Sequence, residues 1–279
     1  MKMNYYSENS KQFLFSVYYS EKYERNGYYR NHYHTVAELG YVIKGDAKYI
    51  VGDKSYNVSS GDLIIVRSNE RHCIPEVYSE KFSLLNIQFS SYFLWNVCSD
   101  FIKRGKIQSL INTDIEINNL QSSKEIGKAF SDFSEIFDKY AGDSFKIRYA
   151  VLNLICIIAE KLSDDGSIDI PIQHINDVEK AVSFIKSNYM NDISLYDIAK
   201  SATMSRSYFS NIFRNVTGIS PYNYLITTRI EKATEQLKNT TVSVMDIAEG
   251  CGFTSLTSFN KAFKQLIGIT PTEYRKNGK

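Results

Sequence analysis

The sequence of 279 residues is poor in cysteine and proline and has no long apolar run. Its longest apolar stretch, residues 150–159, contains Asn153 and has about half the length of a membrane-spanning helix. The polar residues 1–15 lack the apolar core of a secretory signal. The four cysteines lie far apart without a Cys-x-x-Cys pair, so we expect buried free thiols. These absences predict a cytoplasmic protein that makes no contact with membranes.

The chain also lacks a strong net charge, because 33 lysines and arginines face 31 acidic residues, a balance of +2. Taken over the whole chain, this balance argues against a dedicated nucleic-acid-binding protein. Hydrophobic residues make up 43% and charged residues 23%, which excludes a disordered or fibrous protein. The length is sufficient for two domains.

The first part of the chain, residues 13–89, has the pattern of short β-strands. Segments 38–42, 47–51, 63–66 and 82–89 are rich in β-branched and aromatic residues. Turn signals such as Gly45-Asp46 and Gly61-Asp62 separate them. Short strands at regular spacing predict a small barrel or sandwich.

From residue 123 the apolar residues recur at helical spacing, and two helices are expected at residues 123–137 and 144–162. The second helix has an unusually wide apolar stripe. Two interpretations fit it: packing of the helices on each other and on the sheet, or a helix-mediated dimer interface. The segment Ser-Asp-Asp-Gly-Ser at residues 163–167, with Pro171 soon after, predicts a linker. We expect one domain over residues 1–165 and another over 175–279.

The second part of the chain contains an internal repeat. The segment Ser-Leu-Tyr-Asp-Ile-Ala at 194–199 recurs as Ser-Val-Met-Asp-Ile-Ala at 243–248, an offset of 49. The residues that recur at an offset of 50 are Phe209, Phe213, Gly218, Pro221 and Tyr224, matched by Phe259, Phe263, Gly268, Pro271 and Tyr274. A unit has therefore been duplicated.

Each unit has a capped short helix, a tight turn and a second helix with polar residues at its start, which predicts a helix-turn-helix. A helix at residues 221–238 would join the units and let two recognition helices enter successive major grooves, about 34 Å apart. The alternative is a helical repeat used for protein contacts. Charge favours DNA, because residues 170–279 hold 13 lysines and arginines against nine acidic residues.

Residues 178–276 resemble the DNA-binding domain of the AraC/XylS family. The second unit carries most of the resemblance, through Asp246-Ile247-Ala248, Gly252-Phe253, Phe263-Lys264 and Thr270-Pro271. The resemblance implies a seven-helix domain that binds promoter DNA, with base-reading side chains early in each recognition helix. The implied DNA contacts are Ser205, Arg206, Ser207, Asn211 and Arg214 in the first unit, and Thr254, Leu256, Thr257, Lys261 and Lys264 in the second.

These positions differ in the contacts they can make. Arg206 and Lys261 suit guanine or phosphate, and Asn211 suits adenine. Leu256 can contact only a thymine methyl group. Arg214 and Lys264 lie further along the helices and are expected to contact phosphates.

The N-terminal part resembles a cupin domain. His32, His34, Glu38 and Gly45 have the spacing of the first cupin motif, and Gly61 and His72 take the places of the outer residues of the second. Arg67 and Asn69 replace the proline and glycine expected between them, so the second motif is degraded. In the AraC/XylS family, a cupin domain commonly senses a ligand.

The expected effector-binding residues are His32, His34, Glu38, Tyr41 and His72. Tyr33, Tyr41 and Tyr49 would suit stacking on a sugar ring. The alternative is that His32, His34, Glu38 and His72 bind a divalent metal, as in a metal-dependent cupin enzyme with an accessory DNA-binding domain. We expect polar pocket lining, with no cofactor and no catalytic residue.

The sequence therefore predicts an α+β protein. It combines an N-terminal cupin-like β-barrel and helical dimerisation segment with a C-terminal all-α tandem helix-turn-helix domain. The expected function is a homodimeric transcription regulator that binds double-stranded promoter DNA and responds to a small molecule, with carbohydrates as candidates. RNA polymerase would be a partner if the protein is an activator. A second alternative is constitutive DNA binding, with the barrel serving only dimerisation.

Overall fold

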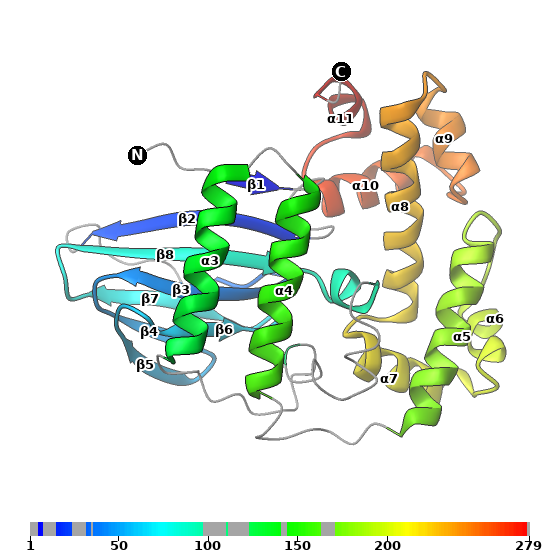
Figure 1. Ribbon diagram of the computed structural model, residues 1–279. Coiled ribbons are helices and arrows are strands. Elements are labelled where there is room, and N and C mark those ends of the chain that lie inside the picture. Colours follow the sequence, from blue (N-terminus) through cyan, green and yellow to red (C-terminus); the bar gives the residue numbers. More distant parts are fainter. Residues whose placement is uncertain are drawn as a thin grey trace. The chain divides into compact units, whose positions relative to one another are not determined.

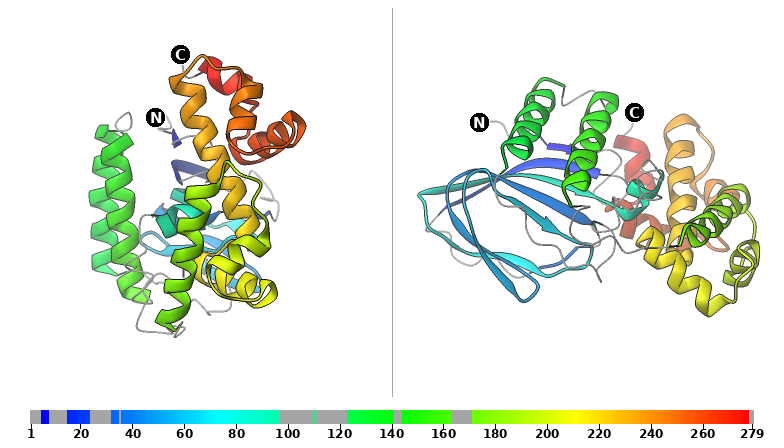
Figure 2. Two further views of the ribbon diagram at one scale, coloured as in Figure 1. Left: turned by 90° about the vertical axis from the view of Figure 1, so that its right-hand side faces the viewer. Right: turned by 60° about the horizontal axis from the view of Figure 1, so that its bottom comes forward.

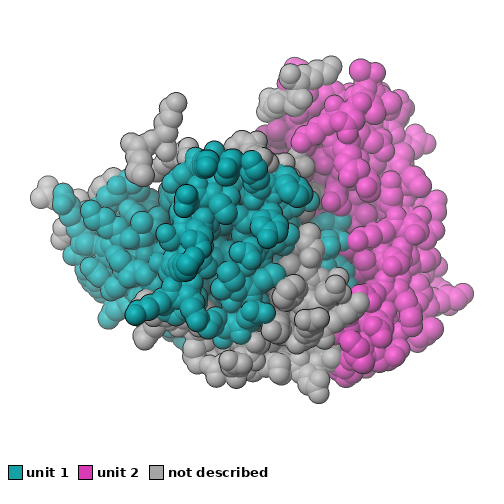
Figure 3. All heavy atoms as spheres, in the orientation of Figure 1, with its two compact units in different colours: residues 1–8, 15–168 teal, residues 9–14, 169–279 magenta. Residues whose placement is uncertain are grey.

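A computed structural model of the protein describes residues 5–7, 15–23, 32–34, 36–96, 110, 123–140, 144–162 and 171–277 (Figure 1). The chain divides into two compact units (Figure 3). The first comprises residues 1–8 and 15–168, and the second comprises residues 9–14 and 169–279. The linker expected at residues 163–167 lies outside the described residues.

The first unit contains two antiparallel sheets, one with strand order β1-β2-β8-β3-β6 and one with order β5-β4-β7. The strands are β1 (Tyr5–Ser7), β2 (Phe15–Tyr23), β3 (Ala37–Lys44), β4 (Ala47–Val51), β5 (Lys54–Val58), β6 (Leu63–Val66), β7 (His72–Val77) and β8 (Lys81–Phe89). The four segments expected from the sequence lie within β3, β4, β6 and β8. The sequence did not single out β1, β2, β5 and β7, of which β5 and β7 have more polar residues.

The inner faces of the two sheets enclose a common core. Val42, Ile64 and Leu84 come from the five-stranded sheet, and Tyr49 and Ile74 come from the three-stranded sheet. Because successive side chains of a strand point to opposite faces, the residues between them point outward. The expected cupin-like β-domain is thus present, with its interior reached by alternate residues of each strand.

Two helices, α3 (Lys124–Tyr140) and α4 (Ser144–Leu162), lie side by side across the outer face of the five-stranded sheet (Figures 1 and 2). The ring of Tyr41 stacks on Phe130 at 4.3 Å, and the ring of Tyr19 lies 5.7 Å from Phe137. Packing on the sheet therefore accounts for one side of the helix pair, as the first interpretation of the apolar stripe expected.

The described residues of the second unit form helices joined by short connections, with no strand among them. Its helices are α5 (Ile172–Asn188), α6 (Leu195–Ser201), α7 (Arg206–Thr217), α8 (Pro221–Asn239), α9 (Val244–Gly250), α10 (Leu256–Ile267) and α11 (Pro271–Asn277). Helix α8 runs between the group α5 to α7 and the group α9 to α11 (Figure 1). Of the helices that the structure describes in the whole chain, none has both the length and the apolar character needed to span a bilayer.

The duplication extends to the packing of aromatic rings. In the first helix-turn-helix unit, Phe213 lies 5.4 Å from Phe209 and 5.6 Å from Tyr224. The corresponding second set, Phe259, Phe263 and Tyr274, has both separations at 5.5 Å. All six rings are buried. The repeated residues thus form the same small core twice.

The helix ends follow the expected capping pattern. Ser194 accepts a hydrogen bond from the Asp197 amide, and Asp197 accepts one from the Ser194 amide, which completes a capping box. Ser243 likewise accepts from the amide of Asp246. Gly218, with φ 78°, and its counterpart Gly268 end the recognition helices in the left-handed region that glycine favours.

The cysteines are less uniformly buried than expected. Cys251 is buried, whereas Cys73 and Cys156 are half-buried. Cys98 lies outside the described residues. Burial raises the pKa of Cys251 to about 11, so its thiol stays protonated near neutral pH.

The turn of each helix-turn-helix unit contains a residue with positive φ. This residue is Gly252 in the second unit, with φ 84°, and Thr203 in the first, with φ 57°. A β-branched residue is strained in this region, by about 1–3 kcal/mol. We expect Thr203→Gly to stabilise the second unit by about 0.5–1.5 kcal/mol after the greater chain entropy of unfolded glycine is subtracted.

Urea unfolding followed by circular dichroism measures this change. Ser201→Gly, within α6, is the control and should destabilise by about 0.5–1 kcal/mol, because glycine is unfavourable in a helix. A lower unfolding free energy for Thr203→Gly would show that the Thr203 backbone is not strained.

Candidate nucleic-acid interface and effector pocket

The recognition helices α7 and α10 each have one buried and one exposed face. Phe209 and Phe213 fix α7, and Phe259 and Phe263 fix α10. The opposite face of each helix carries the DNA contacts expected from the sequence. All ten are exposed: Ser205, Arg206, Ser207, Asn211, Arg214, Thr254, Leu256, Thr257, Lys261 and Lys264.

The two exposed faces match in register. Ser207, Asn211 and Arg214 are spaced by four and three residues, which places them on one side of α7. Their counterparts at an offset of 50, Thr257, Lys261 and Lys264, occupy the same side of α10. Each helix thus presents a polar row ending in a cation, which suits base edges near its start and a phosphate further along.

The serines that precede the two recognition helices differ in the hydrogen bonds that their hydroxyl groups make. Ser255 accepts a hydrogen bond from the Ser258 amide and so caps α10. Ser205 occupies the same position before α7 but makes no side-chain capping bond. Its hydroxyl group is therefore not committed to the helix end.

The structure adds residues that sequence reasoning missed. Tyr208 is 50% exposed on α7, and its hydroxyl group lies 3.0 Å from Nε2 of His174. Its spacing of three residues from Asn211 was the available signal. Near α10, an open groove combines the expected cations with additional polar residues. Its lining is Asn260, Lys261, Lys264, Gln265, Thr270, Pro271 and Thr272.

Helix α8 joins the two recognition units as a shared core element. Tyr224 near its start packs on Phe213 of the first unit. Further along, Ile230, Ala233 and Leu237 are buried in the core of the second. The helix expected as a spacer at residues 221–238 therefore holds both units through its own side chains.

A pocket of about 180 Å³ lies in the interior of the first unit, which is smaller than the sites that hold drug-sized ligands. Both sheets contribute to it. It is lined by Tyr18, Ser20, His32, Glu38, Tyr49, His72, Cys73, Ile74, Leu84 and Asn86. None of these residues is a lysine or an arginine.

Glu38 is the most buried acidic group of this pocket, at 5% exposure. A buried carboxylate needs hydrogen-bond partners to offset the loss of water. The side-chain amide of Gln88 donates to Glu38 Oε2 at 2.6 Å, and Nε2 of His34 lies 3.1 Å from the same oxygen. Gln88 also donates to the Tyr18 hydroxyl group at 3.0 Å. The carboxylate is therefore anchored on two sides.

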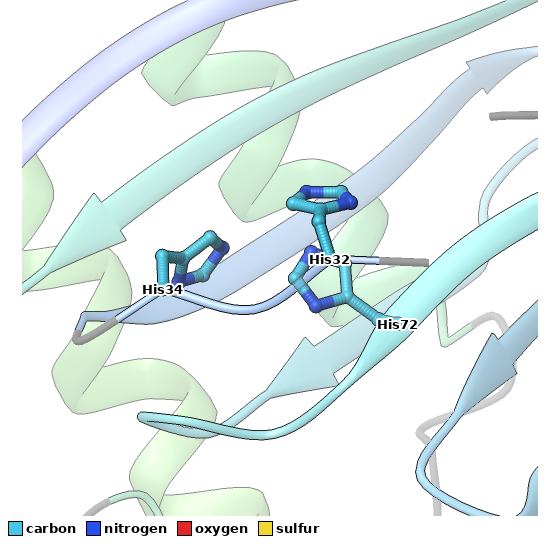
Figure 4. A group of neighbouring side chains, drawn as sticks. All are labelled: His32, His34 and His72. Carbon is cyan, nitrogen blue, oxygen red and sulfur yellow. The ribbon is translucent and has the colours of Figure 1, made fainter. Parts of the chain in front are cut away.

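The rings of His32, His34 and His72 lie close together (Figure 4), and His32 and His72 are part of the pocket lining. The ring centroids of His32 and His72 are 4.2 Å apart, and those of His34 and His72 are 4.8 Å apart. Paired backbone hydrogen bonds between His32 and His72 hold the segment against β7. Asn69 donates its amide to the His34 carbonyl, with φ 63° at Asn69.

Both ring nitrogens of His34 face acceptors. Nδ1 lies 2.8 Å from the Val36 carbonyl, and Nε2 lies 3.1 Å from Glu38. The ring donates to both when it is protonated at both nitrogens. Burial disfavours that charge, but the hydrogen bonds that the ring donates to Glu38 and Val36, with the negative charge of Glu38, outweigh it, and the pKa of His34 is raised. Burial also opposes the Glu38 charge, but the bonds from His34 and Gln88 hold the Glu38 pKa below its ordinary value.

The metal alternative can be tested on this arrangement. The nearest ligand atoms of His32, His34 and His72 lie within 4.8 Å of one another, so a divalent ion could draw on these three rings and on Glu38. A doubly protonated His34, however, has no lone pair for a metal. His34 would have to lose a proton and leave Glu38. As arranged, the His34–Glu38 hydrogen bond occupies one of the four side chains that a metal ion would need, and a bound ion would have to displace it.

The charged pair gives the first unit a characteristic pH dependence. At pH values at which His34 is charged, we expect the free energy of unfolding of the natural protein to exceed that of His34→Gln by about 1–3 kcal/mol. Because the folded pKa of His34 lies above 6.5, this excess is complete below pH 6.5 and disappears as the pH rises through the raised value. It also requires ionised Glu38 and so falls in strongly acidic solution.

Thermal unfolding from pH 5 to 9, in buffer treated with a chelator, measures the excess. The sole tryptophan, Trp95, is buried in the first unit and provides its fluorescence signal. An excess that grows with rising pH would contradict a charged His34.

The structure separates the expected effector residues into two groups. His32, His34, Glu38 and His72 lie together. The expectation for Tyr41 is corrected, because its ring lies on the outer face of the sheet, stacked on Phe130. Tyr41 is three residues from Glu38 on one strand, and this odd spacing puts the two side chains on opposite faces. Of the other tyrosines expected to stack on a sugar, Tyr49 lines the pocket and Tyr33 is 62% exposed.

The chain is similar to known families and proteins in both of its parts. The family described as "Helix-turn-helix domain" matches residues 198–277, and "Cupin domain" matches residues 20–88. The lactose operon transcription activator of Staphylococcus xylosus is 23% identical over 239 residues, which cover 85% of this chain and 82% of that protein. The melibiose operon regulatory protein of Escherichia coli K12 is 22% identical over 254 residues, 88% of this chain and 83% of that protein. A solved structure of ToxT from Vibrio cholerae covers 94% of this chain and 98% of its own, with 18% identity and a TM-score of 0.46.

Proposed function

We propose that the chain is a DNA-binding transcription regulator of the AraC/XylS family, in which a small effector bound in the pocket controls how the two recognition helices engage promoter DNA. The pocket is the observation that carries this proposal, because it joins a buried hydrogen-bonding network to an apolar wall. Its residues line a binding site and are not assigned a catalytic role. We place the protein in the cytoplasm, where promoter DNA and metabolites are both available.

The pocket favours a neutral ligand rich in hydroxyl groups. Glu38 accepts hydrogen bonds, and Asn86, whose amide donates to Ser20 at 2.8 Å, adds a second polar side chain. His72 directs Nδ1 to the Glu70 carbonyl, which leaves Nε2 as the acceptor of its neutral ring. Among the described residues that line the pocket there is no lysine or arginine, so a carboxylate or phosphate ligand would find no such cation beside the His34–Glu38 pair. The names of two relatives, which refer to lactose and melibiose operons, also support a carbohydrate.

Thermal shift of the full-length protein tests the pocket. The panel contains neutral mono- and disaccharides, sugar phosphates and aliphatic carboxylates. A neutral sugar at 100 times its dissociation constant should stabilise the first unit by about 2.7 kcal/mol. Glu38→Gln, which keeps the shape and removes the charge, should lose most of this shift, while Tyr33→Phe, outside the pocket lining, should keep it. A shift only with anionic ligands would contradict the assignment.

A metal-dependent cupin enzyme with an accessory DNA-binding domain is the alternative, favoured by the grouping of His32, His34 and His72. A bound Zn²⁺, Mn²⁺ or Fe²⁺ would supply Lewis-acid chemistry at these rings and Glu38. Mass spectrometry of the native protein distinguishes the two. One equivalent of tightly bound metal would support this alternative and overturn the hydrogen-bonded arrangement of His34.

Helix α4 supports a homodimer. Its sheet-facing side is buried, yet Phe145 and Tyr149 are 79% and 66% exposed. With the half-buried Leu152 and Cys156, they form a seam at spacings of four, three and four residues, as in paired helices. We propose that a second copy of the chain covers this seam. A barrel that served only dimerisation would give this contact without an effector response, so the sugar panel also tests that alternative.

Tyr149→Glu should raise the dimer dissociation constant about 10- to 100-fold, because it places a charge in the apolar seam. Sedimentation velocity at several protein concentrations measures the change. Tyr78→Glu, at a tyrosine 52% exposed outside α4, is the matched control and should leave association unchanged. Equal dissociation constants for the two variants would exclude this seam. If the protein activates transcription, RNA polymerase is a further partner.

A further inference from the structure

Arg229 is a buried cation in the middle of helix α8. The residue is 8% exposed. Its Nε donates a hydrogen bond to the Tyr189 carbonyl, and a terminal guanidinium nitrogen donates one to the Asn191 carbonyl, both at 2.8 Å. These carbonyls follow the last residue of α5, Asn188. The C-terminal end of a helix carries partial negative charge, so the guanidinium group satisfies both the backbone and the helix dipole there.

The other side of Arg229 faces the second recognition unit. Its guanidinium carbon lies 5.8 Å from the ring centre of Phe253, in the turn of that unit. A Cβ atom on the neighbouring Gly252 would lie 2.5 Å from the Tyr189 carbonyl oxygen and 3.0 Å from that of Met190. The end of α5, the middle of α8 and the turn before α10 therefore meet around one side chain.

The first unit shows that this contact, and not the turn alone, requires glycine at position 252. Thr203 holds the equivalent place in the first turn with φ 57°, so the turn tolerates a side chain. The difference lies in the surroundings, because Thr203 is exposed while Gly252 has the backbone of residues 189 and 190 against its Cα.

We propose that Arg229 is a positioning residue that fixes the spacing and rotation of the two recognition helices. Helix α5 packs on α6 and α7, so its end is part of the first reading unit. Phe253 is in the core of the second. By binding both, Arg229 makes the domain rigid, and the protein accepts only one separation between the two DNA half-sites. The inference rests on both recognition helices reading DNA.

The proposal is tested by measuring how DNA affinity depends on the spacing between the two half-sites. A binding site is first selected from random DNA with the intact natural protein, and a second DNA carries one extra base pair between the half-sites. This insertion rotates one half-site relative to the other by about 35°. The natural protein should lose about 10- to 100-fold in affinity on the longer DNA, comparable to one or more mismatched base pairs. Arg229→Met should bind the selected site about tenfold more weakly, but lose less than about threefold on insertion.

Two further variants separate positioning from charge and from folding. Lys232→Met removes a cation from the same helix, where Lys232 contacts Glu235, and should retain the full penalty for insertion. Gly252→Ala keeps every charge and should behave like Arg229→Met. Arg229→Lys, with a single ammonium group in place of the two-pronged donor, should show an intermediate penalty.

The outcomes discriminate clearly. Weaker binding of Arg229→Met and Gly252→Ala with an unchanged penalty for insertion would overturn the proposal. If both variants lose their folded second unit, Arg229→Lys decides the matter, and a full penalty in that variant overturns it. Failure of the natural protein to select any two-part site would contradict DNA reading by both helices and leave no spacing to fix.

Discussion

Replacing Phe263 by alanine is expected to destabilise the second unit by about 3–5 kcal/mol and to abolish specific DNA binding. Phe263 is fully buried on α10, and its ring lies 5.5 Å from the rings of both Phe259 and Tyr274. Its removal leaves a cavity among rigid aromatic rings that cannot close around it. Because α10 carries the second set of DNA contacts, its loss removes half of the reading surface.

Two optical signals localise this effect. Circular dichroism reports the helices of both units, whereas the fluorescence of Trp95 reports the first unit. In Phe263→Ala, the unfolding transition followed by circular dichroism should move to a lower urea concentration. The transition followed by tryptophan fluorescence should stay at the same urea concentration. Phe213→Ala, its counterpart on α7, should give a loss of similar size. A decrease of less than about 1 kcal/mol in the free energy of unfolding would show that the three aromatic rings do not stabilise the second unit as described.

Removing one polar contact from each recognition helix is expected to give the largest loss of DNA affinity short of unfolding. Asn211 and Lys261 are exposed at corresponding positions of α7 and α10. Each base contact is worth about 1–3 kcal/mol, and the two residues lie on separate helices, so Asn211→Ala with Lys261→Ala should cost about 2–6 kcal/mol. This corresponds to a loss of about 30-fold to more than 10,000-fold in affinity.

Fluorescence anisotropy with the selected site and with unrelated DNA measures the loss. A base contact weakens binding to the selected site only, whereas a phosphate contact weakens binding to both and lowers the salt dependence. Lys232→Ala, on the joining helix, is the control. A double variant with undiminished specificity would remove these two residues from the reading surface.

Much of the fold follows from local patterns. The repeated Phe, Gly and Ser-Asp positions determine the helices, caps and aromatic cores of the second unit, and a helix-turn-helix family matches residues 198–277, as expected from them. The cupin spacing likewise anticipated the grouping of His32, His34 and Glu38. Such features depend on residues close in sequence, or on a motif that carries its own spacing.

Whole-chain charge was the least informative pattern. The small net charge argued against DNA, but it averages a basic C-terminal part with an acidic remainder. The 13 basic and nine acidic residues of positions 170–279 are the relevant balance for the recognition helices.

The missed features depend on tertiary contacts. Tyr41 was assigned to the pocket by residue type, although its odd spacing from Glu38 already placed it on the other face. The contact of Arg229 with residues 189 and 191 joins positions about forty apart, and nothing local marks that arginine as buried. The two acceptors around His34 likewise become visible only when Val36 and Glu38 are folded around the ring.

Selection of random DNA with the intact protein at moderate salt, followed by footprinting, tests the central claim most directly. Two recognition helices joined rigidly by α8 should enrich a site with two half-sites about one helical turn apart, and protect both on one face of the duplex. The neutral sugar that shifts the unfolding temperature should then change the occupancy of that site. Enrichment of a single short box, or of no sequence at all, would contradict a regulator that reads DNA with both units.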